Sequence, residues 1–335
     1  MEMVKIGLFG CGHLGKIHLR LALSNPSMKV AGIYDTNAEV LDACAKEFGV
    51  QTYTDPIQLM EDSDAVLIVT PTLTHYKIAA DAIKRGKHAF IEKPVTESVK
   101  EAKSLLALAH EANVIVQVGH VERFNPAFLS AREYCLNPMF IEGHRLAQFN
   151  PRGTDVSVVL DLMIHDIDIV LSLVKSSIRR ISASGVAIIS NSPDITNARI
   201  EFDNGCVANL TASRISMKNM RKIRVFGPEA YISMDFLEKN SSIIRILPVI
   251  DESDPLAVII DPGAGKPKRQ IIMESPQPLE INSIGLEHES FCRAILKGEN
   301  PAVSLEDGLS ALEVAYKILD KLDLTSDFPP LPTIS

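Results

Sequence analysis

The segment of residues 4–18 most constrains the fold, because it carries the glycine spacing G-x-G-x-x-G between two periodic segments. The apolar run VKIGLFG precedes the turn, and the helical pattern HLGKIHLRLALSN follows it. Strand, glycine turn and helix in this order are typical of the first unit of a dinucleotide-binding fold. There Gly10 permits the tight turn, Gly12 lets the backbone approach a pyrophosphate, and Gly15 lets helix and strand pack closely.

An acidic residue, Asp35, ends the next predicted strand, KVAGIYD, 20 residues after Gly15. A carboxylate there accepts hydrogen bonds from the adenosine ribose hydroxyls and repels a 2′-phosphate, so NAD is predicted rather than NADP. Cys11, His13 and Leu14, which lie among the glycines, are expected beside the cofactor, with its phosphates at the helix N-terminus. The alternative is an ordinary turn at the end of a strand.

Strands and helices alternate up to about residue 122, which predicts a first domain, residues 1–122, with a doubly wound parallel Rossmann sheet. A short strand and the start of a helix are expected within residues 51–62, and a further strand is expected at residues 114–120. Residues 123–335 differ: a helix is predicted over 158–174, followed by strand runs with short turns. This pattern predicts an α+β domain with an open, largely antiparallel sheet.

Composition limits the function classes. The net charge is −8 with no long basic run, which argues against a nucleic-acid surface. The apolar runs are too short to span a membrane, and no signal-peptide pattern is present. The cysteines are scattered, odd in number and without a CxxC pair, which is typical of reduced thiols in a cytoplasmic protein. They are Cys11, Cys44, Cys135, Cys206 and Cys292.

One candidate for chemistry is Lys93, in the segment FIEKPVT. It follows a predicted parallel strand, and ligands of open α/β sheets bind beyond the carboxyl ends of such strands. Lys93 is therefore expected where the nicotinamide lies. The alternative is a surface lysine in a loop.

A second candidate is the segment DLMIHDID, with Asp161, His165 and Asp168. Asp161 and His165 are four residues apart on a predicted helix and share a face, so the carboxylate can orient the imidazole as a general base. A solvated acidic face and a metal site that includes Asp168 are the alternatives. No metal is expected, because such a set does not suit Mg²⁺ and no fourth ligand is clustered with it.

The glycine turn, TPTLTH, EKP and the D-x-x-x-H helix occur in this order, and the chain resembles the Gfo/Idh/MocA oxidoreductases from end to end. The resemblance implies hydride transfer between a nicotinamide cofactor and a sugar or cyclitol carbon. It implies that Lys93 and His165 are catalytic and that Asp161 supports His165. The further residues expected to line the cofactor are Thr70, Pro71, His75, Glu92 and Gln117.

The segment QVGHVERFNPA departs from the family pattern, because Val121 stands where many members have asparagine, although Arg123 is kept. This segment and the D-x-x-x-H helix resemble the nucleotide-sugar branch, which implies a UDP-linked N-acetylhexosamine oxidised at C3. Guanidinium groups suit a diphosphate, so Arg123 and Arg152 are expected to bind substrate together with Lys93, Asp161 and His165. Arg145 lies in the same part of the chain. Structural ion pairs are the alternative role of these arginines.

Three other functions stay open: an oxidoreductase of a free sugar or cyclitol, an NAD-dependent glycoside hydrolase that returns its hydride, and a non-enzymatic NAD-sensing regulator. The joint presence of Lys93 and His165 argues against the regulator. The open sheet also predicts a homodimer or homotetramer, because monomers seldom expose a large apolar face. Candidate residues of this sheet are Val207, Ala208, Leu210, Ile223 and Val225.

Overall fold

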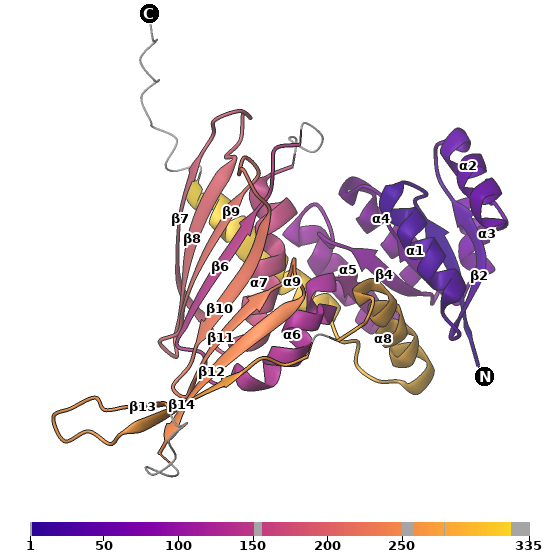
Figure 1. Cartoon of the computed structure of the whole chain (residues 1–335). Coiled ribbons are helices and arrows are strands. Elements are labelled where there is room, and N and C mark those ends of the chain that lie inside the picture. The colour runs from indigo at the N-terminus through magenta and orange to yellow at the C-terminus, as the bar shows by residue number, and fades with distance from the viewer. Residues whose placement is uncertain (1, 151–155, 250–257, 278, 323–335) are drawn as a thin grey trace, which may run out of the picture. The chain divides into compact units, whose positions relative to one another are not determined.

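The computed structural model describes residues 2–150, 156–249, 258–277 and 279–322. The chain forms two compact units (Figure 1). The first unit comprises residues 1–124 and 281–313, and the second unit comprises residues 125–280 and 314–335. One unit carries a parallel sheet and the other a largely antiparallel sheet, which confirms the predicted fold class.

The first unit is built on five parallel strands in the order β2-β1-β3-β4-β5. They are β1 (Val4–Phe9), β2 (Met28–Tyr34), β3 (Ala65–Ile68), β4 (His88–Glu92) and β5 (Val116–Gly119). Every residue of β3 and β5 is buried, because helices cover both faces of a parallel sheet. The strand predicted at residues 114–120 is β5.

The helices of the first unit follow local signals in the sequence. Asn37 caps the start of α2 and Gly49 ends it in the left-handed conformation, while Ser98 and Glu101 form a capping box at α5. The helices are α1 (His13–Ser24), α2 (Ala38–Phe48), α3 (Pro56–Glu61), α4 (His75–Ile83), α5 (Val99–Ala112) and α8 (Ser283–Lys297), with 3₁₀ turns η1 (Thr72–Thr74) and η2 (Val121–Phe124).

Of the short strand and helix start expected within residues 51–62, the strand is reduced to one bridge between Thr52 and Ile33. Asp55 already caps α3, and Pro56 stands in its first turn. The helix therefore begins before the extended segment can form a longer ladder with β2.

Helix α8 corrects the predicted domain boundary. Its residues Phe291 and Cys292 belong to the hydrophobic core of the first unit, and the rings of Phe90 and Phe291 lie 6.1 Å apart. Residues 281–313 therefore return to the first unit, whereas the sequence assigned all of residues 123–335 to the second domain. Apolar periodicity predicts a helix here, but it does not say on which core the helix packs.

The second unit is built on nine strands in the order β13-β14-β12-β11-β10-β6-β9-β8-β7. Its only parallel neighbours among the described residues are β6 and β9. The strands are β6 (Phe140–Leu146), β7 (Ile178–Val186), β8 (Ile195–Phe202), β9 (Val207–Ser213), β10 (Met220–Phe226), β11 (Ala230–Asp235), β12 (Asn240–Pro248), β13 (Val258–Ile260) and β14 (Arg269–Glu274).

Short turns join these strands as the sequence predicts. Gly205 adopts a φ of 88° between β8 and β9, and Asn204 accepts a hydrogen bond from the Cys206 N–H. Between β10 and β11 the Gly227 N–H donates to the Ala230 carbonyl. The predicted short turns between strands are thus observed at these two positions.

One face of the sheet is covered within the second unit, where α6 packs on β11 and β12, and α7 packs on β6 and β9 (Figure 1). The remaining helices and turns are α6 (Pro126–Ala131), η3 (Arg132–Tyr134), η4 (Val159–Met163), α7 (Ile164–Leu173) and α9 (Leu305–Leu322), the last of which is divided between the two units.

The five candidate residues of this sheet lie in β9 and β10, and the structure shows which face each of them takes. The fully buried residues on the covered face are Ala208, Leu210, Ile223 and Val225. Val207 alternates with them along β9 and is only half-buried, so it alone of the five lies on the open face.

No helix in the described part of the chain is long and apolar enough to cross a membrane. The five cysteines are all buried free thiols, and none of them forms a disulfide. A cytoplasmic location stays a prediction.

Candidate active site

The glycine turn of the first unit has the geometry that its spacing predicts. Gly10 has a φ of 97°, and a Cβ there would lie 2.4 Å from the Val69 carbonyl oxygen. A Cβ on Gly15 would lie 2.0 Å from the Gly10 carbonyl oxygen, whereas one on Gly12 would meet no atom within 4 Å. Gly10 and Gly15 are thus required by the turn itself, and Gly12 leaves open space on its outer side.

The start of α1 fits a phosphate. Its N-cap residue is Gly12, and neither a capping side chain nor an acidic residue is present in its first turn. The first N–H groups of a helix need acceptors, and its dipole favours an anion there. His13 and Leu14 are both exposed at this end of the helix. The turn therefore suits a dinucleotide pyrophosphate.

Asp35 lies directly after β2 and is tied to the glycine turn. Its Oδ2 accepts the Cys11 N–H at 2.8 Å, and its Oδ1 accepts the Asn37 N–H at 2.8 Å. The half-buried carboxylate thus holds the turn and also carries the negative charge expected at the adenosine ribose. The backbone N–H of Cys11 is used by Asp35.

We expect Asp35→Ser to weaken NAD binding and to relax the preference for NAD over NADP, because it removes both the charge and the anchor of the turn. Asp35→Asn is the matched control, since its amide oxygen can still accept the Cys11 N–H. It should relax the preference with a smaller loss of NAD affinity. Calorimetric titration with both cofactors tests this, and equal or tighter NADP binding by the unmodified protein contradicts it.

His75 joins the loops that follow β3 and β4. Its Nε2 lies 2.9 Å from the Thr70 carbonyl oxygen and its Nδ1 lies 2.9 Å from the Pro94 carbonyl oxygen. Burial of the ring lowers the pKa of His75, and this effect is larger than the rise caused by the two carbonyls. Both ring nitrogens face backbone carbonyls, and the one N–H of a neutral ring donates to one of them. Cofactor contacts by Thr70, Pro71 and His75 stay predictions.

Lys93 follows the last residue of β4, and its backbone is held from the side chain before it. Glu92 Oε2 accepts the Lys93 N–H at 3.1 Å, and the Lys93–Pro94 peptide bond is cis. Glu92 is buried, whereas Lys93 is half-buried. Lys93 thus lies at the carboxyl edge of the sheet, where the sequence predicts the nicotinamide.

Gln117 is tied to α8. Its Nε2 donates to the Glu287 carbonyl at 2.9 Å, and its Oε1 accepts from the Ser290 hydroxyl at 3.3 Å. The side chain is fully buried, and both of its polar atoms have partners within the first unit. A contact with the cofactor stays a prediction.

In the second unit, Asp161 and His165 lie where two kinds of helix meet. Asp161 belongs to the π-helical turn η4, and His165 is the second residue of α7. Asp161 is exposed and His165 is half-buried. The sequence predicted one regular helix over 158–174, but an i→i+5 turn has no local sequence signal. Such turns are frequent at functional sites.

The structure does not support the metal alternative on this helix. Asp168 is buried, whereas Asp161 is exposed. Across the described residues, no group of three or more His, Cys, Asp or Glu side chains could hold a metal ion.

The arginines have different surroundings. The Arg145 guanidinium donates from Nε and Nη2 to Asp166 Oδ1, at 3.0 and 2.8 Å, and both side chains are buried. Arg145 therefore forms a structural ion pair, which was the alternative to a role in substrate binding. Arg123 lies 3.7 Å from Asp307 in the first unit. Arg152 lies outside the described residues.

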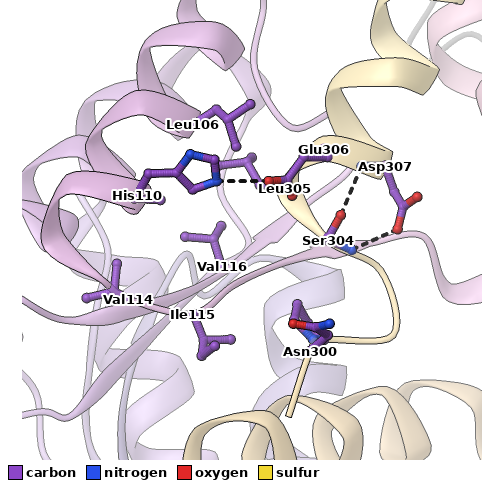
Figure 2. A pocket seen from close by; sticks show the side chains of 12 residues that line it. Leu106, His110, Val114, Ile115, Val116, Asn300, Ser304, Leu305, Glu306 and Asp307 are labelled. Atoms are coloured by element: carbon purple, nitrogen blue, oxygen red, sulfur yellow. Dashed lines mark hydrogen bonds and ion pairs between the residues drawn. The ribbon is translucent and has the colours of Figure 1, made fainter. Parts of the chain in front are cut away.

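A cavity of about 480 Å³ lies elsewhere in the first unit, beside α5, β5 and the start of α9 (Figure 2). His110 Nε2 lies 3.0 Å from Glu306 Oε1 at this cavity, and Ser304 and Asp307 exchange hydrogen bonds. These polar groups of the cavity are thus bonded to one another at the start of α9. None of the predicted site residues of the described chain lines it, and we assign it no function.

Comparison with known proteins decides the family. The model of the oxidoreductase family with an NAD-binding Rossmann fold matches residues 4–120, and that of the GFO/IDH/MocA C-terminal domain matches residues 137–233. UDP-N-acetylglucosamine 3-dehydrogenase of Acidithiobacillus ferrooxidans is 37% identical over 72% of this chain and 76% of its own length. The chain belongs to the Gfo/Idh/MocA oxidoreductase family. The resemblance predicted from the motifs is confirmed.

Two further likenesses extend this result. The solved structure of the Acidithiobacillus ferrooxidans enzyme has a TM-score of 0.87 with 31% identity, over 97% of this chain and 99% of that one. The NAD-dependent scyllo-inositol 2-dehydrogenase of Bacillus subtilis is 34% identical over 64% of this chain and 68% of its own length. This Gfo/Idh/MocA member is therefore an NAD-dependent oxidoreductase that acts on hydroxyl groups, and its first unit is the NAD-binding domain.

Proposed function

We propose that the protein oxidises the C3 hydroxyl of a UDP-linked N-acetylhexosamine to a ketone, with NAD as the hydride acceptor. The observation that carries the proposal is the likeness to UDP-N-acetylglucosamine 3-dehydrogenase, which is 37% identical over 72% of the chain and whose structure matches 97% of the chain at 31% identity. The retained lysine and histidine add the groups that alcohol oxidation needs.

The chain's own residues take three roles in this reaction. His165 accepts the proton of the C3 hydroxyl, and Asp161, four residues earlier, orients its imidazole. The Lys93 ammonium stabilises the alkoxide that develops as the proton leaves. Bound NAD supplies the electrophilic carbon that takes the hydride from C3. Glu92 holds the backbone N–H of Lys93, and the glycine turn holds the pyrophosphate of the cofactor.

The nucleotide part of the substrate requires a cationic contact. We propose Arg152 for the diphosphate, in the segment NPRGTDVS before η4, with Arg123 as a second contact. Arg145 is not proposed, because its guanidinium is already used by Asp166.

Oxidation of a cyclitol is the second candidate, and the likeness to scyllo-inositol 2-dehydrogenase favours it. A glycoside hydrolase of the same fold would differ in one respect: its hydride returns, so no NADH accumulates.

A substrate panel tests the proposal. The purified protein is incubated with NAD and UDP-N-acetylglucosamine, UDP-N-acetylgalactosamine, scyllo-inositol, myo-inositol or glucose, and NADH and the keto product are measured. We expect turnover of a UDP-N-acetylhexosamine, with a product two hydrogen atoms lighter. Robust oxidation of a cyclitol or glucose without turnover of either UDP-sugar would overturn the substrate assignment and leave the dehydrogenase assignment intact.

We also propose that the protein is a homo-oligomer formed through the open face of the second unit's sheet. An apolar row crosses this face from strand to strand, and its members pair directly across the ladders. Phe226 packs against two other rings of the row, with centroid distances of 5.9 and 4.9 Å. The row consists of Val207, Phe140, Phe226, Tyr231, Ile244 and Met273.

Phe226→Glu is expected to weaken this assembly by about 10- to 100-fold, because burial of a phenylalanine contributes about 1.5–3 kcal/mol. Lys100→Glu, an exposed change of charge on α5, serves as the control and should leave the assembly intact. Light scattering at micromolar concentration measures the mass. A monomeric unmodified protein contradicts the prediction.

A further inference from the structure

Three buried ionisable side chains form a chain of contacts inside the first unit. His18 Nε2 lies 3.0 Å from Glu92 Oε1, and His18 Nδ1 lies 2.9 Å from His288 Nε2. His18 and His288 are completely buried, and Glu92 is 8% exposed. The three residues come from α1, α8 and the end of β4, so segments far apart in the sequence meet here.

The series of contacts that begins at His288 ends at the backbone N–H of Lys93. Glu92 uses Oε1 for His18 and Oε2 for the Lys93 N–H. A Cβ on Gly119 would lie 2.9 Å from Glu92 Cδ, so the carboxylate packs directly on the backbone of β5. The carboxylate therefore connects the buried histidines to the turn that carries Lys93.

A second contact holds the same turn from its other side. The Pro94 carbonyl, one residue after Lys93, lies 2.9 Å from the ring of His75. Glu92 accepts the Lys93 N–H and the His75 ring lies against the Pro94 carbonyl, so the turn that carries Lys93 is contacted on both sides. The position of the lysine side chain starts from this backbone.

The contacts define where the protons lie. A carboxylate only accepts, so His18 donates from Nε2 to Glu92 Oε1. If His18 donated from Nδ1 to His288 Nε2, the proton of a neutral His288 would lie on its buried Nδ1 without an acceptor, so we assign the proton to His288 Nε2, which donates to His18 Nδ1. The remaining His288 Nδ1 is buried without a hydrogen-bond partner among the described residues, as an unprotonated nitrogen can be. Burial, with a smaller contribution from His18, lowers the pKa of His288 to about 3 and keeps it neutral.

We propose that His18, oriented by His288, is a positioning residue that holds the Glu92 carboxylate on the Lys93 N–H and thereby places the lysine for catalysis. His18 is too deeply buried to touch substrate, so it acts through Glu92 alone. The proposal rests on the proposed function, since that function gives Lys93 its catalytic role.

His18→Phe tests the proposal, because the ring shape is kept beside Phe90, whose ring centroid lies 5.5 Å from that of His18, while the donor to Glu92 is lost. We expect kcat with UDP-N-acetylglucosamine to fall by about 10- to 100-fold, as misplaced catalytic groups typically cause, with NAD affinity nearly unchanged. The primary deuterium isotope effect on kcat should rise, because hydride transfer is slowed. His18→Gln, whose amide N–H can reach Glu92, should restore most of the activity.

Two controls separate positioning from a loss of folded protein. His110→Phe, a change at an exposed histidine on α5, should leave kcat and the isotope effect unchanged. In a Lys93→Ala background, His18→Phe should lower kcat no further, because both changes act through the same lysine. An unchanged kcat and isotope effect in His18→Phe, or an equal loss with and without Lys93, would overturn the proposal.

The hydrogen-bond chain is also tested without substrate. In protein labelled with ¹⁵N-histidine, the ring nitrogens of His18 and His288 should both report a proton on Nε2 and none on Nδ1 at neutral pH. Assignment uses the His18→Phe and His288→Phe variants. A proton on Nδ1 of either ring would overturn the chain of contacts, whereas absence of turnover by the unmodified protein with a normal NMR pattern would count against the proposed function only.

Discussion

Lys93→Ala and His165→Ala are each expected to lower kcat by about 10²–10⁴-fold while NAD binding persists. His165→Ala removes the imidazole proposed to take the hydroxyl proton, and Lys93→Ala removes the charge proposed to stabilise the alkoxide. The Lys93 variant keeps its backbone N–H on Glu92, so the turn itself should survive the substitution. Steady-state kinetics with the accepted substrate and calorimetry with NAD measure the two quantities.

The matched control is Lys100→Ala, which removes an exposed lysine on α5 and should leave kcat unchanged. Added imidazole should restore part of the activity of His165→Ala, because the variant retains a space for a diffusible base. If His165→Ala keeps a near-normal kcat, the base has been wrongly assigned.

Asp166→Ala is expected to lower the free energy of unfolding by about 3–5 kcal/mol, since it leaves a buried guanidinium without its carboxylate. Both side chains of the Arg145–Asp166 pair are 3% exposed, so water cannot replace the lost partner without rearrangement. Urea unfolding of the whole protein measures the effect, because the midpoint and the slope m together give the free energy of unfolding.

The double replacement Arg145→Met with Asp166→Leu is the control, because removing both charges together avoids an unpaired buried ion. It should recover most of the stability lost in Asp166→Ala and leave KM for the nucleotide sugar unchanged. A large rise in KM in this double variant would show that Arg145 contacts the substrate after all.

The features predicted best from the sequence are those with strict local requirements. Gly10 and Gly15 tolerate no Cβ where they stand, so the turn shows directly as a spacing. Apolar and polar residues alternate along β8 and Asn204-Gly205 follows it, and such signals predicted the run of strands in this part of the chain. The order of elements followed from such local signals, and with it the fold class.

The features that sequence reasoning missed depend on contacts between distant segments. His18 and His288 are 270 residues apart, and their pairing leaves no trace in either local pattern. The one available signal was a histidine on the buried side of α1, beside Leu19 and Ala22. In the same way, the sequence did not predict the ion pair of Asp166, because its partner Arg145 lies on another element, β6.

The central claim is that hydride leaves C3 of a UDP-N-acetylhexosamine for bound NAD. UDP-N-acetylglucosamine carrying deuterium at C3 tests it most directly, with NADH and the sugar product analysed by mass spectrometry after one turnover. The account predicts that the deuterium appears in the reduced nicotinamide and that the sugar becomes a ketone without it. Unlabelled NADH with deuterium retained in the sugar, or no reduction of NAD at all, would contradict it.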